Sequence, residues 1–151
     1  MQRNRFLPDL NKPRPEAERA RRFDLGFAHG RDAMSKAALL VQDEPAVRRL
    51  LRLRLEREGV PVVEAPSARQ ALAIYAERAD MIGVVVSAVR MAGLDGDELL
   101  TALRQADPEV PVFFFTSTPP ADPLPPNVAV FGKPHGLTDL LRAVRELIPA
   151  A

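Results

Sequence analysis

The stretch VPVFFFT at residues 110–116 decides the fold that this sequence predicts. Side chains alternate between the two faces of a strand, so three consecutive phenylalanines place aromatic rings on both faces. A strand that is apolar on both faces is typical of a parallel sheet covered by helices on each side. The run AALLV at residues 37–41 is too short for a helix and is apolar in the same way. These two runs predict buried strands of one parallel sheet.

Strand-like and helix-like segments alternate around these two runs. A helix is predicted to begin near Pro45 and to end at Gly59. Its expected buried face consists of Val47, Leu50, Leu51 and Leu55. Further strands are predicted at 60–63, 81–86 and 128–131, and further helices after Ser67, around Leu99 to Leu103 and at 137–148. This order predicts an α/β fold with a doubly wound parallel sheet, whose functional residues lie at the carboxyl ends of the strands.

Prolines mark two departures from a regular β/α pattern. Pro61 cannot donate a hydrogen bond to a neighbouring strand, so the strand at 60–63 is expected at a sheet edge. The connection between the strands at 110–116 and 128–131 contains Pro119, Pro120, Pro123, Pro125 and Pro126. Each proline in a helix interior costs about 3 kcal/mol, so an extended proline-rich loop is predicted there. Such a loop loses little entropy on binding, which makes its five prolines candidates for an interaction surface.

Composition separates a leader from a folded domain. The chain has 151 residues, of which 46% are hydrophobic, a net charge of +1 and no cysteine. Residues 1–36 carry nine Lys and Arg against five Asp and Glu, which indicates a basic leader at 1–35, disordered or forming one short helix. The domain at 36–149 is mildly acidic, which argues against a nucleic-acid surface on it.

Composition also excludes several classes of site and location. Without cysteine there is no disulfide framework, thiolate zinc site or cysteine nucleophile. No apolar run reaches the roughly 20 residues that a membrane helix requires. The first residues contain no apolar signal core, so the expected location is the cytoplasm.

Four motifs at the predicted strand ends carry a family resemblance. They are QDEP at 42–45, SAVRMAGLDG at 87–96, FFFTS at 113–117 and FGKP at 131–134. With these motifs, residues 36–149 resemble the receiver domain of bacterial two-component response regulators. The resemblance implies a flavodoxin-like sheet of five strands in the order 2-1-3-4-5, here with the fourth crossover helix replaced by the proline-rich loop.

The resemblance also implies a phosphoryl-transfer site, which this sequence matches only in part. Receivers transfer a phosphoryl group from a histidine kinase to their own aspartate with the help of Mg²⁺, a hydroxyl and a lysine. Thr116 and Lys133 match the hydroxyl and the lysine. Of the two adjacent acids that precede Glu-Pro in the family, the first is Gln42 and the second is Asp43. The phosphoacceptor position is Ala88, and a methyl group cannot accept a phosphoryl group.

The pocket is therefore expected to be degenerate. The family's switch aromatic falls on Val130, while Phe131 should point to the opposite face. Asp43 is the only acidic ligand position left, so neither bound Mg²⁺ nor another cofactor is expected. Lys133 has lost its acidic partner at position 88 and is predicted to pair with Asp43. Strand alternation should point Ser87 away from the Ala88 side.

These expectations lead to three hypotheses of function. The first is a stand-alone receiver-like module that is not an enzyme, lacks phosphorylation at Ala88 and acts by protein contact. Its expected partner is a histidine kinase, another regulator or a second copy of the chain, rather than a nucleic acid or a membrane. The second is a phosphoryl-accepting regulator with a different acceptor residue, or one whose Ala88 was introduced by engineering. The third is a protein that binds nucleic acid or a membrane surface through its basic leader.

Overall fold

The computed structural model describes residues 36–117, 124–133 and 135–149. Its elements in chain order are β1 (Ala37–Val41), α4 (Pro45–Arg57), β2 (Val62–Ala65), α5 (Ala68–Arg78), the 3₁₀ turn η1 (Ala79–Met81), β3 (Ile82–Ser87), α6 (Gly96–Ala106), β4 (Val112–Thr116), β5 (Val128–Gly132) and α7 (Leu137–Leu147). The predicted leader and Pro119, Pro120 and Pro123 lie outside the described residues. No helix in the described ranges is long and apolar enough to cross a membrane.

The five strands form one parallel sheet in the order β2-β1-β3-β4-β5, which confirms the predicted order. Strand β2 lies at an edge, as Pro61 indicated. The strand itself begins at Val62, two residues later than predicted. Pro61 precedes it and contributes only its carbonyl, which accepts a hydrogen bond from the Ala38 amide at 2.9 Å.

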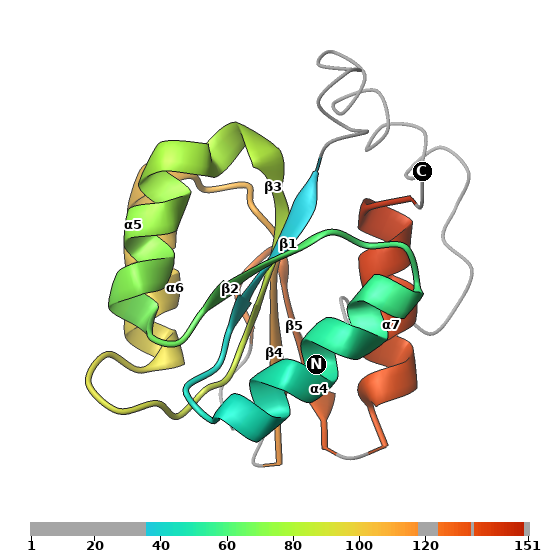
Figure 1. Ribbon diagram of the computed structural model, residues 1–151. Helices are drawn as coiled ribbons and strands as arrows, with labels where there is room; N and C mark the ends of the chain where they lie inside the picture. Colours follow the sequence, from blue (N-terminus) through green and yellow to red (C-terminus); the bar gives the residue numbers. More distant parts are fainter. Residues whose placement is uncertain (1–35, 118–123, 134, 150–151) are drawn as a thin grey trace.

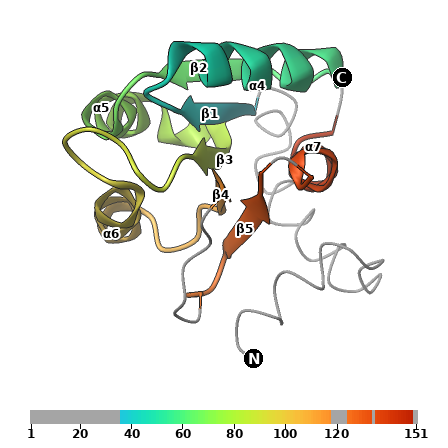
Figure 2. The same cartoon turned by 90° about the horizontal axis from the view of Figure 1, so that it is seen from below.

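Helices cover both faces of the sheet. Figure 1 shows α4 and α7 on one side and α5 and α6 on the other, and Figure 2 shows the same layers from below. Phe113 and Phe115 are buried in the core on the α4–α7 side, where the Phe113 ring meets Phe131 edge to face at 5.3 Å. Phe114 is buried in the core on the α5–α6 side. The three rings therefore fill both faces, as predicted.

Helix α4 shows where the predicted buried face was wrong. Leu51 and Leu55 are fully buried and Val47 packs beside them, so the buried stripe follows a spacing of four residues. Leu50 is 49% exposed, because it is turned about 100° from Leu51 around the helix axis. The start of α5 agrees with the prediction, since the Ser67 hydroxyl accepts a hydrogen bond from the amide three residues later.

The segment that returns to β5 is held by one arginine. Residues 124–127 form no helix, and Leu124 packs against the core on the α5–α6 side. The Arg104 guanidinium donates to the carbonyls of Val110 at 2.7 Å, Pro126 at 3.3 Å and Asn127 at 3.2 Å. Arg104 thereby joins the end of α6 to the start of β5.

A second contact supports this arginine. The Tyr75 hydroxyl donates to a carboxylate oxygen of Asp107 at 2.6 Å, which links α5 to the residue after α6. Burial, and then the hydrogen bond to Asp107, raise the pKa of Tyr75. Arg104 donates to the Asp107 carbonyl at 3.3 Å, and burial lowers the pKa of Arg104. These residues form one polar cluster at the amino end of β4.

Candidate functional site at the carboxyl ends of the strands

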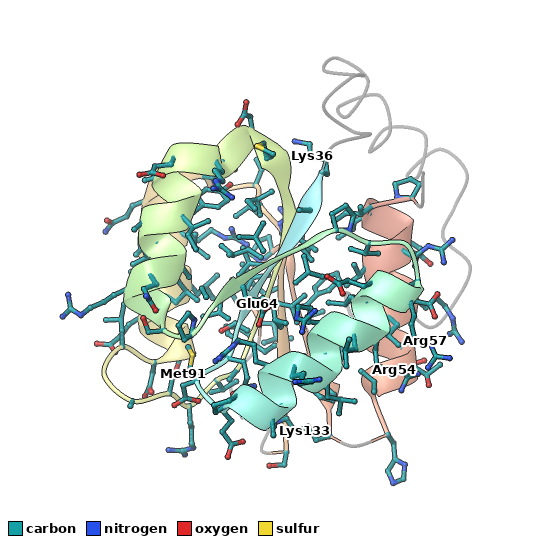
Figure 3. The ribbon with its side chains drawn as sticks, viewed as in Figure 1. Lys36, Arg54, Arg57, Glu64, Met91 and Lys133 are labelled. Carbon is teal, nitrogen blue, oxygen red and sulfur yellow. The ribbon has the colours of Figure 1, made fainter. Side chains whose placement is uncertain are left out.

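Backbone hydrogen bonds bring the predicted site residues to one end of the sheet. The Ala88 amide donates to the Val41 carbonyl at 3.0 Å, which aligns the ends of β1 and β3. The Lys133 amide donates to the Thr116 carbonyl at 2.9 Å, which aligns the ends of β4 and β5. Figure 3 shows Lys133 at the end of the sheet opposite Lys36.

Asp43 holds the loop that follows β3. Its Oδ2 accepts a hydrogen bond from the Ala92 amide at 3.2 Å. In the same loop the Asp95 carboxylate accepts a hydrogen bond from the Met91 amide at 3.0 Å. Two carboxylates thus fix the conformation of residues 91–95. One oxygen of Asp43 is already engaged by a backbone donor.

Gln42 stands where the resemblance predicts the first acid of the pocket. It is 3% exposed, and its Oε1 accepts a weak hydrogen bond from the Glu44 amide at 3.4 Å. Its backbone carbonyl accepts a hydrogen bond from the Arg48 guanidinium at 2.7 Å, and Arg48 also contacts Glu64 at 3.2 Å. The amide of Gln42 is neutral, so this buried position carries no charge that would require a cation.

Ala88, at the predicted acceptor position, has an apolar side chain. It is 6% exposed and belongs to the buried cluster that contains Met91 and Phe114. Helix α6 begins directly against it, since a Cβ on Gly96 would lie 2.6 Å from the Ala88 carbonyl oxygen. The neighbouring Ser87 is 1% exposed, and its hydroxyl donates to the same carbonyl at 2.7 Å.

Lys133 does not form the predicted pair with Asp43. Its ammonium lies over the ring of Phe115, 5.5 Å from the ring centre. In the described part of the chain no ion pair joins it to Asp43, whose carboxylate instead receives the Ala92 amide. The prediction was wrong because Lys133 is only partly buried. Water and an aromatic face compensate its charge without a carboxylate.

Sequence reasoning also missed the signal that places Lys133. Phe131 pairs with Phe115 in the β4–β5 ladder, and Lys133 follows Phe131 by two residues. Strand alternation therefore assigns all three to the α4–α7 side. The same alternation separates Val130 from Phe131, and the two are buried on opposite sides of the sheet as predicted.

The residues present do not fit the Mg²⁺ ion that receivers use. Mg²⁺ prefers octahedral oxygen coordination, and protein carboxylates supply its anionic ligands. Here the set contains one carboxylate, with one oxygen engaged by the Ala92 amide, and one neutral amide at Gln42. No group of three or more His, Asp or Glu side chains that could hold a metal occurs among the described residues.

Comparison with known proteins identifies the family. The sequence matches the response regulator receiver domain over residues 38–123. The sensor kinase CckA of Brucella abortus is 38% identical over 120 residues, which are 76% of this chain and 13% of that protein. The C4-dicarboxylate transport transcriptional regulatory protein DctD of Pseudomonas aeruginosa is 42% identical over 78 residues, 52% of this chain and 16% of its own length. The chain thus spans a small part of these curated relatives.

Solved structures agree with this assignment. The receiver domain of the hybrid histidine kinase CckA superimposes with a TM-score of 0.64 at 31% identity, covering 74% of this chain and 98% of that domain. The chemotaxis protein CheY4 of Vibrio cholerae, at 22% identity, shares the fold with a TM-score of 0.62, covering 74% of this chain and 98% of its own. The protein therefore belongs to the response regulator receiver domain family.

Proposed function

We propose that this protein is a cytoplasmic receiver-type signalling module that takes no phosphoryl group at the usual position and acts by protein contact rather than as an enzyme. The observation that carries the proposal is Ala88. Its methyl group stands at the acceptor position and is buried against Met91 and Phe114. A methyl group offers no lone pair for attack on phosphorus, so the phosphoryl transfer of the family cannot take place at this position.

The neighbouring hydroxyls are poor substitutes for the missing acceptor. Ser87 is 1% exposed and its hydroxyl proton is directed to the Ala88 carbonyl. Thr116 is 7% exposed at the end of β4. A nucleophile must reach the phosphorus atom of the donor in line with the leaving group, which burial of this degree prevents.

The proline-rich connection supports the contact role. Pro125 and Pro126 are exposed, while Leu124 is anchored in the core and Arg104 holds the carbonyl of Pro126. Anchoring at this end limits the entropy that a partner's binding would remove. The partner we propose is a histidine kinase, another regulator or a second copy of this chain, in keeping with a receiver domain.

Intact-mass measurement tests the proposal. The protein is incubated with Mg²⁺ and acetyl phosphate beside a variant carrying Gln42→Asp and Ala88→Asp, which restores both lost carboxylates. We expect no added phosphoryl mass on the natural chain and an adduct on the variant that is lost in both acid and base, as an acyl phosphate requires.

Other outcomes separate the alternatives. A stoichiometric adduct on the natural chain would refute the proposal. Its loss in acid would indicate another carboxylate acceptor, and its persistence in acid would indicate a serine or threonine ester. Contact with a second copy is measured on the same natural sample by sedimentation. A variant with Pro125→Ala and Pro126→Ala reports whether the exposed prolines contribute to any association.

A further inference from the structure

The contact between Lys133 and Phe115 replaces a charge partner that the chain has lost. In the described residues Lys133 has no carboxylate partner, and its ammonium lies 5.5 Å from the centre of the Phe115 ring. Phe115 is 5% exposed in the core on the α4–α7 side, so its ring is fixed by packing. A fixed ring can hold a cation at a defined place, because its quadrupole presents negative charge on the face.

This contact places the Lys133 ammonium on the side of the sheet opposite the cluster that buries Ala88. Ala88 is buried with Phe114 on the α5–α6 side, whereas Phe115 and Lys133 lie on the α4–α7 side. Phe114 and Phe115, adjacent in β4, thus lie on opposite faces of the sheet, Phe114 in the cluster that contains Ala88 and Phe115 in contact with Lys133. Lys133 has a fixed backbone, since its amide donates to the Thr116 carbonyl. The conformation of its side chain therefore decides on which face of the sheet the ammonium lies.

We propose that Phe115 is a positioning residue that holds the Lys133 ammonium on the α4–α7 side and so forms a second barrier to phosphoryl transfer, independent of Ala88. The inference deepens the proposed function and rests on it. Restoring a carboxylate at position 88 would then recover only part of the activity, because the lysine that neutralises the phosphoryl oxygens stays partly engaged by the ring. Removing the ring should release it.

Lysine-selective NMR tests the contact on the natural chain. The chain has three lysines, Lys12, Lys36 and Lys133, so ¹³C-lysine labelling gives few signals. Lys36 donates to the Asp80 carbonyl at 2.9 Å, far from any change at Phe115, and serves as an internal reference for folding. We expect the ε-methylene protons of Lys133 to be shifted upfield by the ring, and this shift to disappear in Phe115→Leu.

Two matched variants separate positioning from packing. Phe115→Tyr keeps the aromatic face and should retain the upfield shift. Phe114→Leu removes an equally buried ring from the same strand on the opposite face, so it should leave the Lys133 signal in place. Loss of the shift in Phe114→Leu, or its persistence in Phe115→Leu, would overturn the inference.

Phosphorylation rates test the barrier itself. Starting from the variant with Gln42→Asp and Ala88→Asp, acetyl phosphate gives its phosphoryl group to the carboxylate introduced at position 88. A new P–O bond forms there, and acetate leaves with the electrons of the broken P–O bond. Addition of Phe115→Leu should raise the initial rate about twofold to fivefold, the population change that a partly exposed cation–π contact allows. Addition of Phe115→Tyr should leave the rate unchanged.

The outcomes distinguish the two proposals. Phosphorylation of the natural chain would refute the proposed function, whatever the position of Lys133. An unchanged rate on addition of Phe115→Leu would overturn the barrier while leaving the proposed function intact. If the restored carboxylates give no measurable rate, the NMR result alone decides, and an unchanged Lys133 shift in Phe115→Leu would refute the inference.

Discussion

Replacement of Arg104 by glutamine should release the segment that leads into β5. The guanidinium donates to four carbonyls, at 2.7 Å to Val110 and at 3.2–3.3 Å to Asp107, Pro126 and Asn127. A glutamine side chain is too short to reach the carbonyls before β4 and those before β5 at the same time. It also carries a single amide in place of the several N–H donors of the guanidinium. The helix itself should survive, because arginine and glutamine have similar helix propensities.

The expected loss in free energy of unfolding follows from these contacts. A well-formed hydrogen bond from a charged donor contributes about 2 kcal/mol, which we assign to the short bond to Val110. The three longer bonds contribute about 1 kcal/mol together, because water can replace the donor at the exposed Pro126 and the Asn127 carbonyl also accepts the Val112 amide. The sum is about 3 kcal/mol, a large part of the stability of a domain of this size.

Urea unfolding followed by far-ultraviolet circular dichroism measures this loss. We expect a lower midpoint with an unchanged slope, and faster hydrogen exchange at the Val112 amide, which donates to Asn127. Arg69→Gln is the matched control, since Arg69 is an exposed helical arginine on α5. A loss below about 0.5 kcal/mol, or one equal to that of the control, would refute the view that Arg104 anchors this segment.

Three further predictions concern other contacts. Tyr75 is the only tyrosine and the chain has no tryptophan, so absorbance titration of the phenol should give a midpoint well above the usual value of about 10. Because the pKa of Tyr75 is raised in the folded state, the stabilisation of the fold by the protonated phenol is complete below about pH 10 and is lost as the pH rises further. The Tyr75→Phe variant should lack this part of the loss of stability at alkaline pH. Ser67→Ala should lower the unfolding free energy by about 1 kcal/mol in urea titration, through loss of the helix cap. Gly96→Ala should cost about 1–3 kcal/mol by the same assay, because the new methyl would lie 2.6 Å from the Ala88 carbonyl oxygen; a stability equal to that of the natural chain would contradict this.

Local sequence was sufficient for most of the fold. Hydrophobic periodicity is a property of a few neighbouring residues, so the runs at 37–41 and 110–116 predicted buried strands without knowledge of their partners. The proline before β2 placed that strand at an edge, because a missing backbone donor has the same consequence in any sheet. The apolar side chain of Ala88, on which the proposed function rests, is likewise a matter of chemical identity, which no tertiary contact can change.

Element boundaries and faces required the packed molecule. Strand β2 begins after Pro61 rather than at residue 60, and Leu50 faces solvent although it fits a helical spacing. The start of the strand and the exposure of the leucine both depend on which part of the chain packs against that segment. A one-residue step turns a helical side chain by about 100°, enough to exchange burial for exposure.

Partner choice among polar groups was decided by tertiary structure. The sequence predicted that Lys133 would pair with Asp43, but the two side chains found other partners in Phe115 and the Ala92 amide. Arg104 donates hydrogen bonds to carbonyls of residues as far as 23 positions away in the sequence. Residue identity by itself determined the fold class and led to the prediction that Ala88 replaces the acceptor. Only the tertiary structure decided these pairings, because their energies depend on distances and directions between groups that are remote in the chain.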